Sequence, residues 1–171
     1  MSNAEVPEPR TFTRVFLDSA PLIYFTERHP VFAALAEPYF DLIDSRAVSA
    51  VVSAVTLAEC LVLPLRTGNG PLQTEFQRVM LSNPAVTFVG VDASMAREAA
   101  AFSARYALKL LDAIQVAAAV RTGCDLILTN DLTLRRVREV QVTVLSTLLP
   151  PPRADVAPET AVAVDAPDDS A

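Results

Sequence analysis

The chain has 171 residues and carries 14 Lys and Arg against 20 Asp and Glu, a formal net charge of −6. Half of the residues are hydrophobic (51%), so most of the chain is expected to fold around the core of one domain. The charge excludes a strongly basic nucleic-acid-binding protein of the histone type. Two cysteines in apolar surroundings exclude a disulfide scaffold and a zinc ribbon, and we expect buried thiols in a reducing cytoplasm.

The acidic excess lies at the two ends of the chain. Residues 150–171 hold five acids against one base, whereas residues 11–149 are nearly neutral, with 13 acids and 12 bases. We therefore expect a flexible N-terminus at residues 1–11, a folded domain at residues 12–149 and a disordered, acidic, proline-rich tail at residues 150–171.

Strands and helices are predicted to alternate along the folded part. In chain order the apolar patterns predict a strand at 13–18, a helix from Ser19, a helix at 31–43, a strand at 47–52, helices at 56–65 and 71–83, a strand at 86–91, helices at 92–106 and 110–120, and strands at 125–129 and 142–145. Strands that are continuous apolar runs are typical of a parallel sheet covered on both faces, so we expect an α/β fold.

One apolar stretch, residues 47–65, resembles a membrane span. It contains a single charge, Glu59, which would cost a few kcal/mol inside a bilayer. The stretch also divides into a β-branched strand and a helix with a polar first turn near Ser53. We therefore expect no membrane association.

The histidine count restricts the chemistry. His29 is the single histidine and stands in a polar stretch that we interpret as a surface loop. A histidine pair for acid–base cleavage and a metal site of three histidines are therefore both excluded. Any catalysis must rest mainly on carboxylates.

Four carboxylates stand out by their position. Asp18 and Asp131 follow predicted strands, and ligands of parallel α/β sheets bind at that edge. Glu59 and Asp112 lie on predicted helices among apolar neighbours, where an unpaired carboxylate is costly. Few bases are near these carboxylates in the sequence, so a shared divalent cation is the simplest way to neutralise them. A site with oxygen ligands alone favours Mg²⁺ or Mn²⁺.

Each of these acids also has a structural interpretation. Asp18 and Asp131 are well placed to cap the helical turns that follow them, and Glu59 could be an exposed helix residue. Asp112 is the hardest to explain in this way, because its neighbours are almost all apolar. Asp125 begins its predicted strand, at the wrong edge of the sheet, so we interpret it as structural.

Taken together and in order, four segments make the chain resemble the PIN-domain nucleases, and among them the VapC-like toxins of bacterial toxin–antitoxin modules. The matching segments are VFLDSAPLIYF around Asp18, SAVTLAECLVLP around Glu59, LKLLDAIQVAAAV around Asp112 and DLILTND ending at Asp131. They span residues 15–131. A short strand followed by Asp-Ser is common alone, whereas the ordered set is specific.

This resemblance implies a three-layer αβα sandwich with a central, mostly parallel sheet and a Mg²⁺- or Mn²⁺-dependent endoribonuclease site. Asp18 and Asp112 match the principal metal ligands, and Glu59 and Asp131 would complete the acidic cluster. Ser19 and Thr129 match hydroxyl positions beside the site, and Asn130 is expected to orient a ligand. The implied partners are an RNA substrate, a cognate antitoxin and a second copy of the chain.

The expected reaction is in-line attack on a phosphodiester by water, steered by Glu59 or Asp131. Arg135, Arg136 and Arg138 could grip the RNA backbone or simply form a solvated face. The apolar stretches 32–43 and 57–65 could serve a dimer or an antitoxin groove as well as the core.

Other classes fit less well. A response-regulator receiver needs an acidic pair after the first strand and a late lysine, whereas Ser19 follows Asp18 and Lys109 is the single lysine. A phosphatase with an Asp-x-Asp nucleophile is excluded by Ala20. The alternative that stays open is a non-catalytic, PIN-like RNA-binding or interaction module.

Overall fold

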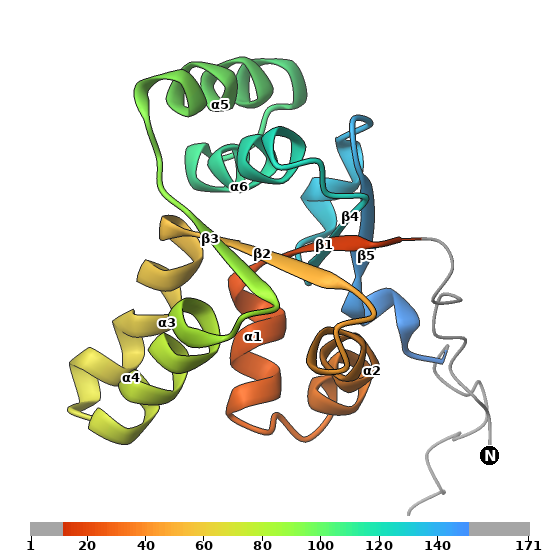
Figure 1. Ribbon diagram of the computed structural model, residues 1–171. Helices are drawn as coiled ribbons and strands as arrows, with labels where there is room; N and C mark the ends of the chain where they lie inside the picture. Colours follow the sequence, from red (N-terminus) through yellow and green to blue (C-terminus); the bar gives the residue numbers. More distant parts are fainter. Residues whose placement is uncertain (1–11, 151–171) are drawn as a thin grey trace, which may run out of the picture.

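A computed structural model describes residues 12–150 of the chain. Its centre is a sheet of five parallel strands in the order β3-β2-β1-β4-β5 (Figure 1). The strands are β1 (Arg14–Leu17), β2 (Ser49–Ser53), β3 (Val86–Val89), β4 (Leu126–Thr129) and β5 (Gln141–Val144). The chain leaves β1 at the middle of the sheet, next to β4, so the segments that follow these two strands emerge side by side.

Helices cover both faces of the sheet, which gives the expected three layers (Figure 1). On one face lie α5 (Ala93–Tyr106) and α6 (Leu110–Arg121). On the other lie α1 (Ser19–Thr26), α2 (Phe32–Asp44), α3 (Ala54–Thr67) and α4 (Gly70–Gln77). Short helical turns complete the described chain: η1 (Arg78–Ser82), η2 (Leu132–Arg136) and η3 (Leu145–Leu148).

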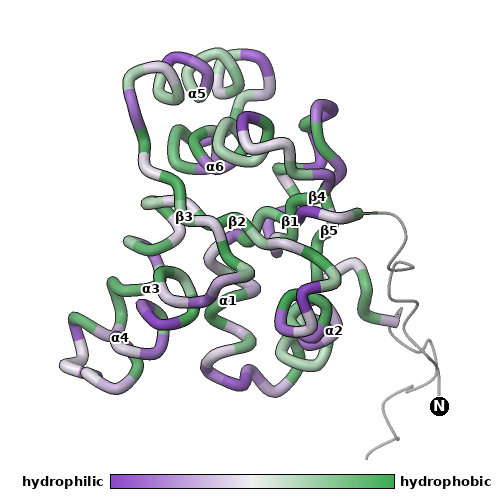
Figure 2. The backbone as a smooth tube through the Cα atoms, in the orientation of Figure 1, coloured by the Kyte–Doolittle hydropathy of each residue, from purple (hydrophilic) through white to green (hydrophobic). Residues whose placement is uncertain are grey.

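Alternate residues of the central strands supply two hydrophobic cores. In β1, Val15 and Leu17 pack toward α1–α4, whereas Phe16 packs toward α5 and α6. All three are at most 1% exposed. Successive side chains of a strand point to opposite faces, so a strand with helices on both sides must be apolar throughout. Figure 2 shows this hydrophobic character along the central strands and along α6.

The predicted elements are confirmed, with two differences. The helix predicted at 71–83 consists of α4 followed by one π-helical turn, η1, which buries Met80. β3 is an edge strand whose Thr87 and Phe88 are exposed, so one end of the sheet is covered less completely than expected. The three-layer αβα prediction holds, and every strand pairing is parallel.

Asp125 and His29 both have structural roles. At the amino ends of the strands, Oδ2 of Asp125 accepts hydrogen bonds from the backbone N–H and hydroxyl of Thr13 and from the N–H of Arg14. Nδ1 of His29 accepts bonds from the N–H groups of Val31 and Phe32 at the start of α2. The structural interpretation of Asp125 is thus confirmed.

Two predictions concern residues beyond those that the structure describes. The flexible N-terminus expected at residues 1–11 lies outside the described part, as does the tail expected at 150–171 apart from Pro150. Across residues 12–150, no helix is both long enough and apolar enough to cross a membrane.

The Asp125 contacts give a first testable prediction. Replacing Asp125 with Asn should lower the free energy of unfolding by about 1–2 kcal/mol at pH 7, because charge-assisted bonds across 111 and 112 residues are weakened. These bonds lower the pKa of Asp125. Its stabilisation is therefore present above the unfolded-state pKa and lost as the pH falls through the folded-state pKa. Urea unfolding at pH 7 and pH 3 measures the difference, with exposed Asp41→Asn as the control; equal effects of the two substitutions would contradict it.

Candidate active site

The four predicted acids come together at the carboxyl edge of the sheet. Asp18 directly follows β1, and Asp131 lies two residues after the adjacent strand β4. Glu59 lies on α3, and Asp112 lies in the first turn of α6. Each is partly buried. Burial raises the pKa of both Glu59 and Asp112, and the nearby charge of Asp18 adds to the effect.

Asp18 is the most completely bonded of the four. Its Oδ2 accepts a hydrogen bond of 2.6 Å from the hydroxyl of Thr129. Its Oδ1 accepts a hydrogen bond of 2.7 Å from the N–H of Ser19, and by this bond Asp18 caps α1. The same oxygen accepts a hydrogen bond of 2.6 Å from Nε2 of Gln115. The capping interpretation and the site interpretation of Asp18 are therefore compatible, because one carboxylate does both.

Gln115 is a site residue that the sequence reasoning missed. Its Nε2 also lies 3.2 Å from Oε2 of Glu59, so one amide group joins Asp18 to Glu59. The side chain is only 2% exposed. A polar residue one helical turn after Asp112, in an otherwise apolar helix, was the signal that could have identified it.

Burial dominates the electrostatics of the site. It raises the pKa of Asp18 above its ordinary value, although the bonds from Thr129, Ser19 and Gln115 act in the opposite direction. Burial also raises the pKa of Glu59 and Asp112, and the neighbouring acids add to it. Lys109 is the one base that lowers the pKa of Asp112. No salt bridge among residues 12–150 involves any of the four acids.

The donor set fits a hard divalent cation, although the ligands are not yet gathered around one point. Carboxylate oxygens without histidine or thiolate are the ligands that Mg²⁺ and Mn²⁺ prefer. Within the described residues, however, no three acidic, histidine or cysteine side chains lie close enough to hold one ion as they stand. Cys60 contributes nothing, because burial raises the pKa of its thiol to about 12. A bound cation would therefore have to draw several of the carboxylates inward.

The supporting residues have different outcomes. The hydroxyl of Thr129 donates to Asp18 and accepts from the N–H of Asp131, so it connects two of the acids. The hydroxyl of Ser19 lies 3.5 Å from Oδ1 of Asp18, to which it donates. Asn130 is used by the fold instead: its Nδ2 donates to the Tyr24 hydroxyl and its Oδ1 accepts from the N–H of Ser146. The contact of this amide with a ligand stays a prediction.

The three arginines after Asp131 occupy two different places. Arg136 lies within 3.4 and 3.5 Å of the carbonyls of Tyr106 and Ala107, where it closes the end of α5. Arg135 and Arg138 line a shallow depression that also includes Asp125, at the amino end of β4. All three side chains are exposed, so a contact with the RNA backbone and a solvated face both stay open as predictions. Arg135 and Arg138 lie away from the four acids because the chain runs back along β4 before it enters β5.

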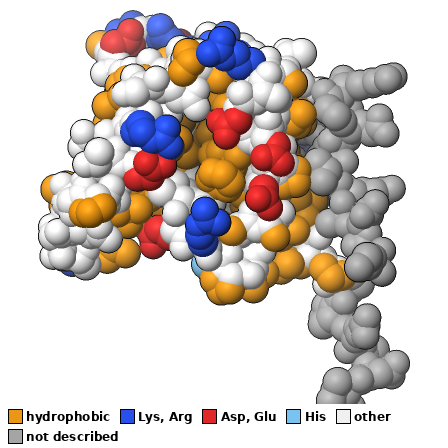
Figure 3. All heavy atoms as spheres, turned by 60° about the horizontal axis from the view of Figure 1, so that its bottom comes forward, with side chains coloured by type: hydrophobic (Ala, Val, Ile, Leu, Met, Phe, Trp, Pro, Cys, Tyr) orange, Lys and Arg blue, Asp and Glu red, His pale blue; other side chains and the backbone are white. Residues whose placement is uncertain are grey.

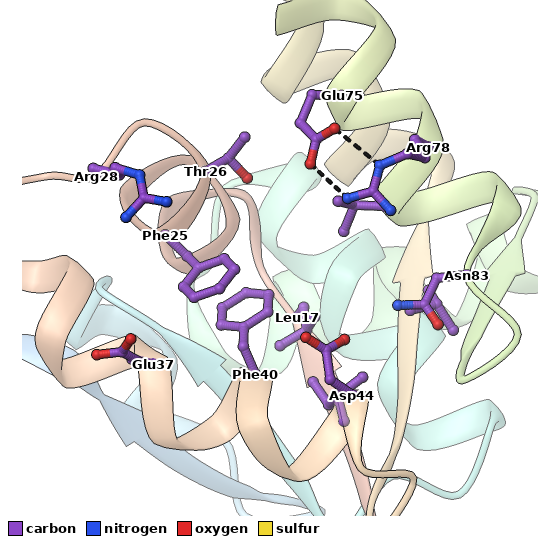
Figure 4. Close-up of a pocket in the computed structure, with 13 residues that line it drawn as sticks. Leu17, Phe25, Thr26, Arg28, Glu37, Phe40, Asp44, Glu75, Arg78 and Asn83 are labelled. Atoms are coloured by element: carbon purple, nitrogen blue, oxygen red, sulfur yellow. Dashed lines mark hydrogen bonds and ion pairs between the residues drawn. The ribbon is translucent and has the colours of Figure 1, made fainter.

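A separate cavity of about 300 Å³ lies on the face covered by α1, α2 and α4, and it contains none of the four acids. Figure 4 shows the rings of Phe25 and Phe40 facing each other in it, with their centroids 4.0 Å apart, and the Glu75–Arg78 ion pair at its rim. Figure 3 shows acidic and basic side chains around a hydrophobic centre on this side of the molecule. Cavity size therefore does not identify the acidic site.

A sequence profile of the family described as "PIN domain" matches residues 15–140. The chain therefore belongs to the PIN domain family, and the resemblance seen in its four segments is confirmed. No curated protein sequence matches the chain.

The solved structures most similar in fold include toxins of toxin–antitoxin systems. VapBC2 from Rickettsia felis, bound to a DNA fragment from its promoter, has a TM-score of 0.61 at 12% identity, covering 77% of this chain and 98% of that one. VapC20 from Mycobacterium tuberculosis, a toxin that cleaves the sarcin–ricin loop, has a TM-score of 0.55 at 16% identity over 66% and 86%. A toxin–antitoxin complex from Klebsiella pneumoniae has a TM-score of 0.59 at 17% identity over 77% and 97%. At these identities the likeness establishes the fold.

The raised pKa values predict that the acidic side chains of the site lower the free energy of unfolding at neutral pH. Between the ordinary and the raised pKa, the folded state binds more protons than the unfolded state, so the free energy of unfolding falls as the pH rises through this range. Replacing Asp112 with Asn should therefore raise the melting temperature of the metal-free protein at pH 7, by a few degrees. The gain should shrink toward pH 4. Calorimetric melting with Asp41→Asn as the control measures it, and a lower melting temperature for Asp112→Asn would contradict the prediction.

Proposed function

We propose that this chain is a divalent-metal-dependent endoribonuclease, the toxin component of a toxin–antitoxin module. The observation that carries the proposal is the convergence of four carboxylates at one sheet edge, three of them with raised pKa values and none in a salt bridge among residues 12–150. Membership of the PIN domain family supports a nuclease. We place the activity in the cytoplasm, where RNA is available.

Asp18 and Asp112 are the proposed principal ligands of Mg²⁺ or Mn²⁺, and Glu59 and Asp131 complete the cluster. When bound, such an ion supplies a Lewis acid and lowers the pKa of water for attack on the phosphodiester. Glu59 would be suited to accept a proton from the attacking water, because burial raises its pKa toward neutral pH. The hydroxyl of Thr129 keeps Asp18 and the loop that carries Asp131 in register.

Neutralisation is central to this proposal. Four carboxylates repel a phosphate backbone, and a divalent ion reverses part of that repulsion at the point of cleavage. Lys109, at the start of α6, is the base nearest in sequence to Asp112, and its positive charge lowers the pKa of Asp112. It is therefore a better candidate for a backbone contact than Arg135 and Arg138, which lie near the amino end of β4.

Cleavage of RNA by wild type and by Asp112→Asn tests the activity. With Mn²⁺ or Mg²⁺ present, we expect the substitution to reduce cleavage by at least about 100-fold, because it removes a proposed ligand. EDTA should abolish wild-type cleavage. Asp41→Asn, at an exposed position of α2, should cleave as wild type does.

The outcomes separate the candidates. Equal cleavage by wild type and Asp112→Asn, or cleavage that survives EDTA, would refute the proposed site. RNA binding without cleavage at any metal concentration would favour the non-catalytic RNA-binding or interaction module instead.

We also propose a cognate antitoxin and a second copy of the chain as partners. The support is that similar folds occur in toxin–antitoxin complexes, including FitAB bound to a DNA fragment. The chain offers apolar surface for such contacts: Val62, Leu63 and Leu65 on α3 are 52–62% exposed, which is more than isolated surface residues require.

Expression with and without the protein encoded by the neighbouring reading frame tests the partner. We expect growth arrest with the chain alone and relief by co-expression, because the partner would hold the nuclease inactive. A stable complex should co-purify, and Leu63→Asp should weaken it if α3 forms part of the contact. Val91→Asp, at another exposed apolar position, is the matched control. Arrest that Asp112→Asn does not relieve would count against a nuclease toxin.

A further inference from the structure

Gln115 occupies an unusual position for an amide. It lies on α6, three residues after Asp112, and its side chain is 2% exposed among alanine and valine residues. Its amide group nevertheless makes several hydrogen bonds. Nε2 lies 2.6 Å from Oδ1 of Asp18 and 3.2 Å from Oε2 of Glu59, and Oε1 lies 2.7 Å from the Thr56 hydroxyl.

The protons of this network can be assigned from its chemistry. An ionised carboxylate only accepts hydrogen bonds, so the NH₂ group of Gln115 must face Asp18 and Glu59. Its Oε1 must then face Thr56, and the Thr56 hydroxyl must donate to it. The oxygen of that hydroxyl is left to accept from the N–H of Ser53, 3.3 Å away. Reversing the amide would place two acceptors against each other on one side.

Thr56 and Ser53 also form the capping box of α3, the helix that carries Glu59. The Ser53 hydroxyl accepts from the N–H of Thr56, and the Thr56 hydroxyl accepts from the N–H of Ser53. Both residues are fully buried. The Thr56 hydroxyl, which caps the start of α3, therefore also holds the Gln115 amide in one orientation. The position of α6 relative to α3 is thereby fixed beside the acids.

We propose that Gln115 is a positioning residue that sets the separation and orientation of Asp18 and Glu59 for divalent-ion binding, with Thr56 fixing its amide. This inference rests on the proposed metal-dependent function. A neutral donor suits the task, because it bridges two like charges without supplying a positive charge that would compete with the ion. Groups that orient metal ligands in this way typically change metal affinity by about 10- to 100-fold when they are removed.

Calorimetric titration with Mn²⁺ tests the proposal on the full chain. We expect Gln115→Leu to weaken Mn²⁺ binding by about 10- to 100-fold. Thr56→Val, which keeps the shape but removes the hydroxyl, should weaken binding in the same direction. Thr56→Ser, which keeps a hydroxyl, should restore binding to near the wild-type value. Melting temperatures of the metal-free variants show whether the fold is kept, and Thr56→Val against Thr56→Ser remains decisive if Gln115→Leu does not fold.

A second measurement needs no metal. In amide NMR spectra of the metal-free protein, the NH₂ group of Gln115 should give two separate signals that exchange slowly with water, identified by their absence in Gln115→Leu. Exchange should become faster in Thr56→Val and stay slow in Thr56→Ser. Equally slow exchange in all three proteins would overturn the role of Thr56 in fixing the amide.

The failure of this inference and that of the proposed function are distinguishable. If wild type binds no Mn²⁺, both are overturned. If wild type binds Mn²⁺ and folded Gln115→Leu and Thr56→Val bind it equally well, metal binding stands and the positioning role of Gln115 is overturned. Weaker binding by both variants at nearly unchanged melting temperature, with recovery in Thr56→Ser, supports the role, since a purely structural residue would not give this pattern.

Discussion

The constraint on which this structure depends is the partial burial of several like charges that form no salt bridge among residues 12–150. Asp18 lies where β1 meets the start of α1, and its position there is fixed by donors from Ser19, Thr129 and Gln115. All three donors are neutral. Neutral donors can hold a carboxylate in place, but they do not cancel its charge. The pKa of Asp18 is raised because its negative charge is buried without a compensating positive charge. The fold thus keeps uncompensated negative charge at this edge of the sheet, and a divalent cation is well suited to neutralise it.

Much of this arrangement could be predicted because it follows from chain order. Continuous apolar strands alternating with helices lead to a parallel sheet, and the residues after β1 and β4 then share an edge. Asp18 and Asp131 follow directly from that rule. Asp112 was predicted for a different reason: a carboxylate in the apolar sequence LLDAIQVAAAV requires an explanation.

What could not be predicted depends on the rotation of helices and the path of loops. Gln115 touches Asp18 across 97 residues, and this contact exists only because α6 packs on the sheet with one particular side turned inward. Arg135 illustrates the opposite case. Arg135 is close to Asp131 in sequence, but η2 carries it away toward the amino end of β4. Closeness along the chain is therefore a poor guide where a loop reverses direction.

The Asn130 amide, which was expected at a ligand, has a different importance. It joins three segments that are distant in sequence: Tyr24 at the far turn of α1, the loop that carries Asp131, and Ser146 in η3. These two hydrogen bonds connect the loop that carries Asp131 to η3 and to the end of α1. The position of the loop that carries Asp131 therefore depends on α1 and on η3 as well as on β4.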